Sequence, residues 1–241
     1  MRFGAKLRRV LQVTIAWLSE REPMLLVSTL LVIAGTWAFV LIAGEVMEGD
    51  THLFDEWAVK SFRNPNDLSQ PIGPPWLQEM GRDATALGGV GWLVFFTLTV
   101  AGYLWLDRKA HMSQFLLAAS ISGMLLTFLL KYYFARPRPD VVPHLSHVST
   151  SSFPSGHSMV SAVVYITLGS LLSAVVARRR LKAYILCVAM MLTLIVGVSR
   201  VYLGVHYPTD VLAGWTAGLS WALACWMLAH WLQRRGDVER E

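Results

Sequence analysis

Three short polar clusters stand where apolar stretches of this sequence begin or end. The first reads KYYFARPRP from Lys131 to Pro139, the second reads FPSGH over 153–157, and the third runs from Ser199 to Asp210. Charged side chains at a membrane boundary are costly, so they usually serve a function. Together the clusters supply cations, imidazoles and a carboxylate, which are the groups needed to hold a phosphate and attack its phosphorus atom.

The third cluster contains a candidate nucleophile and its partner. His206 and Asp210 are four residues apart, so on a helical turn the carboxylate can accept a hydrogen bond from one imidazole nitrogen. That bond fixes the tautomer and leaves the lone pair of the other nitrogen free to attack. The arrangement follows the logic of a catalytic triad, with histidine as the nucleophile. The alternative is a His–Asp pair that only joins two helices.

The second cluster combines a helix start with a histidine. Ser155 suits the N-cap position, and Gly156 lets a ligand approach the backbone. The first N–H groups of a helix lack internal partners and attract anions. An ordinary capped helix explains these two residues equally well, but it does not require His157 beside them.

Cations in the first and third clusters are placed to bind phosphate oxygens. They are Lys131, Arg138 and Arg200. A guanidinium presents a planar donor fork that matches phosphate oxygens, whereas lysine offers a point charge. Pro137 and Pro139 stiffen the chain around Arg138. Taken singly, each cation is also explained by snorkelling or by anchoring to lipid headgroups.

The elements that must position these clusters are membrane helices. The chain has 241 residues, 54% of them hydrophobic and 15% charged, which is not a soluble composition. Six stretches lack Asp, Glu, Lys and Arg over roughly the 17–25 residues that a bilayer span needs. They run approximately over Met24–Gly44, Ala84–Leu106, Met112–Leu130, Ser158–Ala177, Ala183–Ser199 and Val211–Leu232. The pattern predicts an all-α polytopic membrane protein, a six-transmembrane-helix bundle that forms one domain over residues 1–241. Gly214 and Gly218 allow close packing within the bundle or with a second copy.

Basic residues in short loops indicate the orientation of the bundle. They concentrate at residues 2–9, 108–109, 178–182 and 234–235, which all fall on one side of a six-span bundle. That side is predicted to be the cytoplasm, with both termini on it. The polar clusters then meet on the extracytoplasmic (periplasmic) face of a cell inner (plasma) membrane. The formal net charge of +5 follows from this bias and does not indicate nucleic-acid binding.

The order and spacing of the three clusters resemble the type-2 phosphatidic-acid phosphatase superfamily, which also contains vanadium-dependent haloperoxidases. The sequence matches the family motifs K-x6-RP, PSGH and SR-x5-H-x3-D at every fixed position, between Lys131 and Asp210. The six-span layout is similar to the bacterial membrane branch of that family.

This resemblance implies a lipid phosphatase that works through a phosphohistidine. His206 would be the nucleophile, Asp210 would orient it, and His157 would protonate the leaving oxygen. The non-bridging phosphate oxygens would be held by Lys131, Arg138, Arg200, the Ser155 hydroxyl and the Gly156 amide. Ser199 is a candidate for positioning Arg200, and the role of Arg136 stays open.

Neither a metal ion nor another cofactor is expected. The clusters contribute Asp140 and Asp210 as carboxylates, which is fewer than a two-metal site usually uses. A site at helix ends accepts a phosphate whose tail stays in the bilayer, so the predicted substrate is a lipid phosphate or pyrophosphate. Undecaprenyl pyrophosphate, phosphatidic acid and phosphatidylglycerophosphate share this headgroup chemistry, and the motifs do not choose between them. Oligomeric state is not indicated by the sequence.

Two segments lie outside the motifs. Residues 1–22 are basic with apolar residues at helical spacing, which predicts an interfacial amphipathic helix. Residues 45–83 form an extracytoplasmic loop whose prolines predict turns and extended structure around one short amphipathic helix. That helix lies on the membrane surface or acts as a lid over the site. Arg82 and Asp83, at the end of this loop, cap the second span or contact the substrate.

Two other functions stay open. A phosphohistidine can pass its phosphoryl group to an acceptor lipid instead of water, which would make the protein a phosphotransferase. A lipid or anion translocator would place ionisable side chains deep in its spans. Only His230 interrupts the apolar stretches here, near one end, so the sequence favours an enzyme over a translocator.

Overall fold

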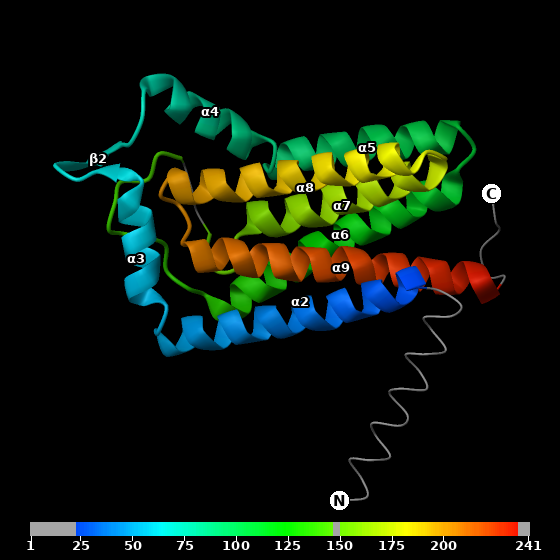
Figure 1. The fold of residues 1–241 in the computed structure, drawn as a ribbon, viewed down its shortest axis with the longest axis horizontal. Helices are drawn as coiled ribbons and strands as arrows, with labels where there is room; N and C mark the ends of the chain where they lie inside the picture. Colours follow the sequence, from blue (N-terminus) through cyan, green and yellow to red (C-terminus); the bar gives the residue numbers. More distant parts are fainter. Residues whose placement is uncertain (1–22, 147–149, 236–241) are drawn as a thin grey trace, which may run out of the picture.

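Long apolar helices form most of the structure. The computed structural model describes residues 23–146 and 150–235, and the interfacial helix predicted over residues 1–22 lies outside the described residues. The helices in Figure 1 are α2 (Pro23–Glu48), α3 (His52–Ser61), α4 (Pro75–Ala86), α5 (Val90–Leu106), α6 (Ala110–Phe134), α7 (Gly156–Val175), α8 (Arg179–Tyr202) and α9 (Pro208–Arg235).

The predicted multi-pass helical fold is confirmed. Within the described residues, five helices are long and apolar enough to cross a membrane: α2, α6, α7, α8 and α9. A sixth span results when α4 and α5, which meet at a bend of 50°, are counted as one. The fold is therefore a bundle of five or six membrane helices.

The second span differs from its prediction. The apolar stretch from Ala84 to Leu106 is interrupted, because α4 ends at Ala86 and α5 begins at Val90. Residues 75–83 are helical, so the turns and extended structure predicted for much of 45–83 are found over residues 62–74 and do not reach the second span. Pro75 stands in the first turn of α4, where its missing N–H needs no partner and its fixed φ suits a helix.

Helix α7, which begins at the FPSGH cluster, occupies the centre of the bundle. It packs against α6, α8 and α9 and is the most buried of the spans, whereas α2 packs on α9 and is the least buried. The core around α7 contains Leu93, Val160, Val164, Tyr165, Ile166, Ala189 and Ala222. The most buried span of the bundle therefore begins at the FPSGH cluster.

Helix α9 approaches the backbone of α7 closely at two glycines. A Cβ atom on Gly214 would lie 2.8 Å from the Ser155 carbonyl oxygen, and one on Gly218 would lie 2.6 Å from the Met159 carbonyl oxygen. A Cβ atom cannot lie this close to a backbone oxygen, so any side chain at either position would push the two helices apart. The glycine pair therefore serves packing within the bundle, which was one of its two predicted uses.

Substituting Gly218→Ala is expected to destabilise the protein, because the added methyl group meets the α7 backbone. Overpacking of this kind costs about 1–3 kcal/mol. The measurement is the Tm of the detergent-solubilised protein. Gly102→Ala in α5 is the matched control, because nothing lies within 4 Å of a Cβ atom there, and alanine favours a helix more than glycine does. Equal Tm values for the two variants would contradict the close packing.

The polar clusters lie at one end of the bundle, which we call the site end (Figure 1). Helices α2, α6 and α8 finish there, and α4, α7 and α9 begin there. Helix α3 crosses this end, at the position where the sequence predicts a short amphipathic helix. Its outward face is apolar, with Leu53, Phe54 and Trp57 exposed, whereas Asp55 is fully buried. An exposed apolar face is typical of a helix at a membrane interface.

A short antiparallel hairpin follows α3. Its strands are β1 (Arg63–Asn64) and β2 (Asp67–Pro71). Arg63 is 2% exposed and donates from Nη1 to the carbonyl of Tyr202, the last residue of α8, at 2.8 Å. Gly204 has a φ of +72°, and a Cβ atom on it would lie 2.5 Å from the Arg63 guanidinium. The hairpin therefore contacts the loop between α8 and α9.

Candidate active site

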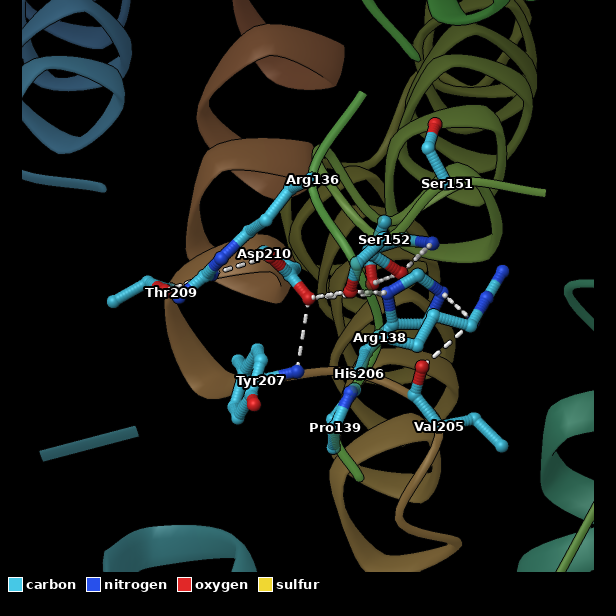
Figure 2. Close-up of polar contacts among 12 residues, drawn as sticks. Arg136, Arg138, Pro139, Ser151, Ser152, Val205, His206, Tyr207, Thr209 and Asp210 are labelled. Carbon is cyan, nitrogen blue, oxygen red and sulfur yellow. Dashed lines mark hydrogen bonds and ion pairs between the residues drawn. The ribbon is translucent and has the colours of Figure 1, made fainter. Parts of the chain in front are cut away.

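His206 and Asp210 lie side by side at the start of α9 (Figure 2). The Nδ1 of His206 is 3.3 Å from Oδ2 of Asp210, and the same oxygen accepts the Tyr207 backbone N–H at 2.9 Å. The Ser152 hydroxyl also donates to Oδ2 of Asp210. Both members of the pair are buried, with His206 1% exposed and Asp210 not exposed at all. The predicted pairing is therefore present, and two further donors hold the Oδ2 atom of the carboxylate.

Arg138 contacts the other nitrogen of the imidazole. Its Nη1 lies 3.2 Å from Nε2 of His206 and donates to the Val205 carbonyl at 2.6 Å. Its Nε donates to the Thr150 carbonyl at 2.7 Å. Because a guanidinium only donates hydrogen bonds, Nε2 must be the acceptor, and Nδ1 carries the proton that faces Asp210. The unprotonated imidazole nitrogen therefore faces a cation, and its lone pair accepts a hydrogen bond from that cation.

Lys131 and Gly156 meet across the start of α7. Lys131 Nζ donates to the Ser151 carbonyl at 2.5 Å, and the Ser151 hydroxyl donates to the Lys131 carbonyl at 2.9 Å. A Cβ atom on Gly156 would lie 3.1 Å from Cε of Lys131. Glycine therefore makes room here for the lysine side chain, a role that the sequence did not indicate.

The Ser155 hydroxyl is the N-cap of α7. It accepts the Ser158 N–H at 3.4 Å and the Ser158 hydroxyl at 2.9 Å. The Ser155 N–H donates to the Asp210 carbonyl at 2.9 Å, which joins the starts of α7 and α9. The capping role is present, and a contact between this hydroxyl and a phosphate stays a prediction.

Arg200 reaches the same region from the last turn of α8. It is 2% exposed, its Nη1 donates to the Thr85 hydroxyl at 2.8 Å, and its Nε has no hydrogen-bond partner in the part of the chain that the structure describes. A buried unpaired donor is costly, so an anion at this place would be stabilised.

His157 is half-buried, and the charged and imidazole groups that act on it electrostatically are Lys131, Arg138, Arg200 and His206.

Some candidate residues point elsewhere. The Ser199 hydroxyl donates to the Val196 carbonyl at 2.7 Å within α8, so its side chain does not position Arg200. Arg82 pairs with Glu79 on α4, with Nη1 2.9 Å from Oε1, and Asp83 is exposed. Neither Arg82 nor Asp83 caps the start of a span, because both lie in the last turns of α4.

Arg136 is the cation whose role the sequence left open. Its Nη1 donates to Asp210 Oδ1 at 2.7 Å and to the Thr209 hydroxyl at 3.0 Å, and its Nη2 donates to Asp55 Oδ2 at 2.8 Å. Its guanidinium carbon lies 4.4 Å from the centre of the Tyr207 ring. The alternation of arginine and proline around Arg136 was the available signal, whereas nothing in the sequence marked Asp55 or Ser152.

Burial controls the protonation of these groups. It lowers the pKa of His206 to about 3, although the hydrogen bond and charge of Asp210 act in the opposite direction. Burial also lowers the pKa of Arg136, but Asp210 and Asp55 outweigh it and raise that pKa above its ordinary value. For Arg138, burial holds the pKa below its ordinary value. At neutral pH the imidazole is therefore neutral and faces a charged guanidinium.

Acidification is expected to destabilise the protein through His206. The pKa of this residue is about 6.5 in the unfolded chain and about 3 in the folded protein, so between these values the unfolded state binds the extra proton. The stability that neutral His206 contributes is thus complete above the higher pKa and is lost as the pH falls toward the lower one. From about pH 7 to pH 5, the Tm of the wild type should fall more steeply than that of His206→Gln. Parallel Tm curves would contradict this expectation.

The arrangement can carry out attack on a phosphorus atom. A neutral imidazole is oriented by a carboxylate, and its unprotonated nitrogen faces one of several cations. In the described residues, no group of three or more His, Cys, Asp or Glu side chains is arranged to hold a metal ion.

Comparison with known proteins points to one family. The model of the PAP2 superfamily matches residues 113–234. Phosphatidylglycerophosphatase B of Bacillus subtilis is 37% identical over 151 residues, which cover 61% of this chain and 73% of that protein. The lipid A 1-phosphatase of Rhizobium etli is 30% identical over 175 residues, covering 61% and 71% respectively. The crystal structure of a transmembrane PAP2 type phosphatidylglycerolphosphate phosphatase from Bacillus subtilis superposes with a TM-score of 0.75 at 28% identity, covering 87% of this chain and 98% of that one.

Proposed function

Because this chain belongs to the PAP2 superfamily, we propose that it is an integral-membrane enzyme that hydrolyses the phosphomonoester or diphosphate headgroup of a lipid through a phosphohistidine. Hydrolysis of a lipid phosphate is the activity in the names of its relatives. One observation carries the proposal: Nδ1 of His206 faces Asp210 while Nε2 faces Arg138. A nucleophile is thereby oriented toward the place where an anion binds.

The catalytic roles follow from the atoms that face one another. Nε2 of His206 attacks phosphorus, so that the N–P bond forms while the P–O bond to the lipid breaks. His157 gives its proton to the leaving oxygen. Asp210 stabilises the positive charge on the imidazole of the phosphohistidine. Water, giving a proton to His157, then attacks phosphorus and releases inorganic phosphate, which returns both histidines to their starting states.

The phosphate oxygens would be held by groups from three helices and from the segment between α6 and α7. Lys131 comes from the end of α6, Arg200 from the end of α8, and Arg138 from the segment between α6 and α7. The Gly156 amide and the positive end of α7 face the same region, with the Ser155 hydroxyl as a further candidate contact. Charge developing on the oxygens during phosphoryl transfer is stabilised by such fixed donors. We therefore expect the reaction to need no metal ion and no other cofactor.

The substrate follows from where the site lies. A pocket at the ends of membrane helices takes a headgroup while the lipid tail stays in the bilayer. One relative is named for phosphatidylglycerophosphate and another for the 1-phosphate of lipid A, and a pyrophosphate would offer the same oxygens. The basic residues at 108–109 lie between α5 and α6, and those at 178–182 lie at the start of α8, both at the other end of the bundle, which supports a cytoplasmic position for that end. We infer one membrane-embedded domain over residues 1–241, with its site on the extracytoplasmic face of the inner membrane.

The proposal is tested with purified protein in detergent and a panel of lipid phosphates, scored by release of inorganic phosphate. The panel contains phosphatidic acid, phosphatidylglycerophosphate and undecaprenyl pyrophosphate, each with and without a chelator. Phosphate release that survives the chelator is expected for at least one substrate. Absence of phosphate release from every substrate would overturn the proposal, and phosphate found on an acceptor lipid would identify a phosphotransferase.

A further inference from the structure

Asp55 is a buried acid that the proposed mechanism does not use. It lies on α3 with no exposed surface. Its Oδ1 accepts the Thr209 backbone N–H at 3.2 Å, and its Oδ2 accepts the Thr209 hydroxyl at 2.6 Å and Nη2 of Arg136 at 2.8 Å. A buried carboxylate is costly unless it is paired in this way. Asp55 therefore connects the helix that crosses the site end to the first turn of α9.

Arg136 lies between this carboxylate and the catalytic one. Its Nη1 donates to Oδ1 of Asp210 at 2.7 Å, and the other oxygen of Asp210 faces His206 at 3.3 Å (Figure 2). The Arg136 side chain is 11% exposed, so water screens these charges little. An unbroken series of contacts thus runs from Asp55 through Arg136 and Asp210 to the nucleophile.

The charge of this group decides how strongly it acts on His206. Two carboxylates and one guanidinium give the group a single net negative charge. Without Asp55, the guanidinium would be opposed by Asp210 alone, and the net charge of this group would be zero. The imidazole becomes positive when Nε2 bonds to phosphorus, and charges interact strongly in a poorly screened site. The net negative charge therefore stabilises the transition state more than the resting enzyme.

We propose that Asp55 is a positioning residue for the His206–Asp210 pair. Asp55 offsets part of the positive charge of Arg136, so that this charge does not cancel the negative charge that Asp210 presents to the imidazole. This inference rests on the proposed function, because it concerns the same reaction at the same site. The competing explanation is that Asp55 only anchors α3 to α9 through Thr209.

The first test is Asp55→Asn in the full-length protein, assayed with phosphatidic acid in mixed micelles. The expected result is a fall in kcat of about 10–100-fold, the size usual for residues that support a primary catalytic group. KM should change little, because Lys131, Arg138 and Arg200 remain in place. Asp50→Asn is the matched control: it removes the same charge from an exposed position beside α3 and is expected to keep the wild-type kcat.

A double variant separates charge from anchoring. Asp55→Asn combined with Arg136→Gln restores the net negative charge beside His206, so it is expected to have a higher kcat per folded molecule than Asp55→Asn alone. Thr209→Val removes an anchoring hydroxyl without changing any charge, and it is expected to lower kcat less than Asp55→Asn does. An anchoring role predicts the reverse, since the double variant loses more contacts than either single one.

A wild-type kcat in Asp55→Asn, or a double variant no faster than Asp55→Asn, would overturn the inference. Should Asp55→Asn fail to fold, Arg136→Gln and the double variant still test it. If Asp55 acts through Arg136, the Arg136→Gln variant and the double variant should have similar kcat values. A much lower kcat in the double variant would overturn the inference. Failure of the proposed function looks different, since the wild type itself would then release no phosphate.

Discussion

Phosphate release from lipid phosphates is expected to disappear in His206→Ala. A methyl group cannot attack phosphorus, so no covalent intermediate forms, and water would have to attack the lipid phosphate directly. The expected loss in kcat is roughly 10⁴-fold or more, on the scale known for triad nucleophiles. The measurements are phosphate release and the trapping of labelled phosphate on the protein. The wild type should carry an acid-labile, base-stable phosphate, and the variant should carry none.

Its control is His52→Ala, which replaces an exposed histidine of α3 whose side chain is 62% accessible. That variant is expected to retain wild-type turnover and labelling. Far-UV circular dichroism of His206→Ala should match the wild type, because α8 and α9 are held by their own packing. Near-normal phosphate release by a folded His206→Ala protein would show that another group is the nucleophile.

In His157→Ala, turnover of phosphatidic acid is expected to fall by about 10²–10⁴-fold, the usual contribution of a general acid. The alkoxide that leaves from this substrate needs a proton, and His157 is the proposed donor. The nitrophenolate that leaves from p-nitrophenyl phosphate is a weak base and needs no proton. Phosphorylation of His206 by the aryl substrate should therefore survive, while hydrolysis of the phosphohistidine, which uses His157 as the base, should be slow.

The readout for His157→Ala is a burst of nitrophenolate, close to one equivalent per enzyme, followed by slow steady-state release. The wild type should show a smaller burst relative to its steady rate, because its second step is not impaired. Equal losses with the lipid and the aryl substrate, without a burst, would mean that His157 binds the phosphate instead of transferring a proton.

The membrane helices could be predicted because their main requirement is local, since each span must be apolar over its own length. The predicted ends are less accurate for a physical reason. Lys131 and Arg200 end the apolar stretches, yet both lie inside the last turns of α6 and α8. A charged residue is unfavourable inside the bilayer but not inside a helix. The apolar stretch in the sequence therefore ends before the helical backbone does. The bend between α4 and α5 is likewise invisible to it.

The parts of the site that could be predicted are those whose residues lie close together in the sequence. His206 and Asp210 are four residues apart, and Ser155 stands at a helix start. Asp55 and Arg136 are 81 positions apart, and only the folding of α3 across the site end makes them neighbours. A lone acid on a short helix has no local pattern that marks a distant partner, so sequence spacing could not have paired Asp55 with Arg136.

Helix α3 differs from the surface helices of water-soluble proteins, because its large apolar residues Leu53, Phe54 and Trp57 are exposed while Asp55 is buried together with Ala58 and Val59. Once the protein is extracted from the membrane, bound detergent and lipid must cover α3 as well as the sides of the bundle. Harsh delipidation would expose Leu53, Phe54 and Trp57 to water and loosen the helix that carries Asp55. Preparations differing only in residual lipid are therefore expected to differ in turnover number before they differ in melting behaviour.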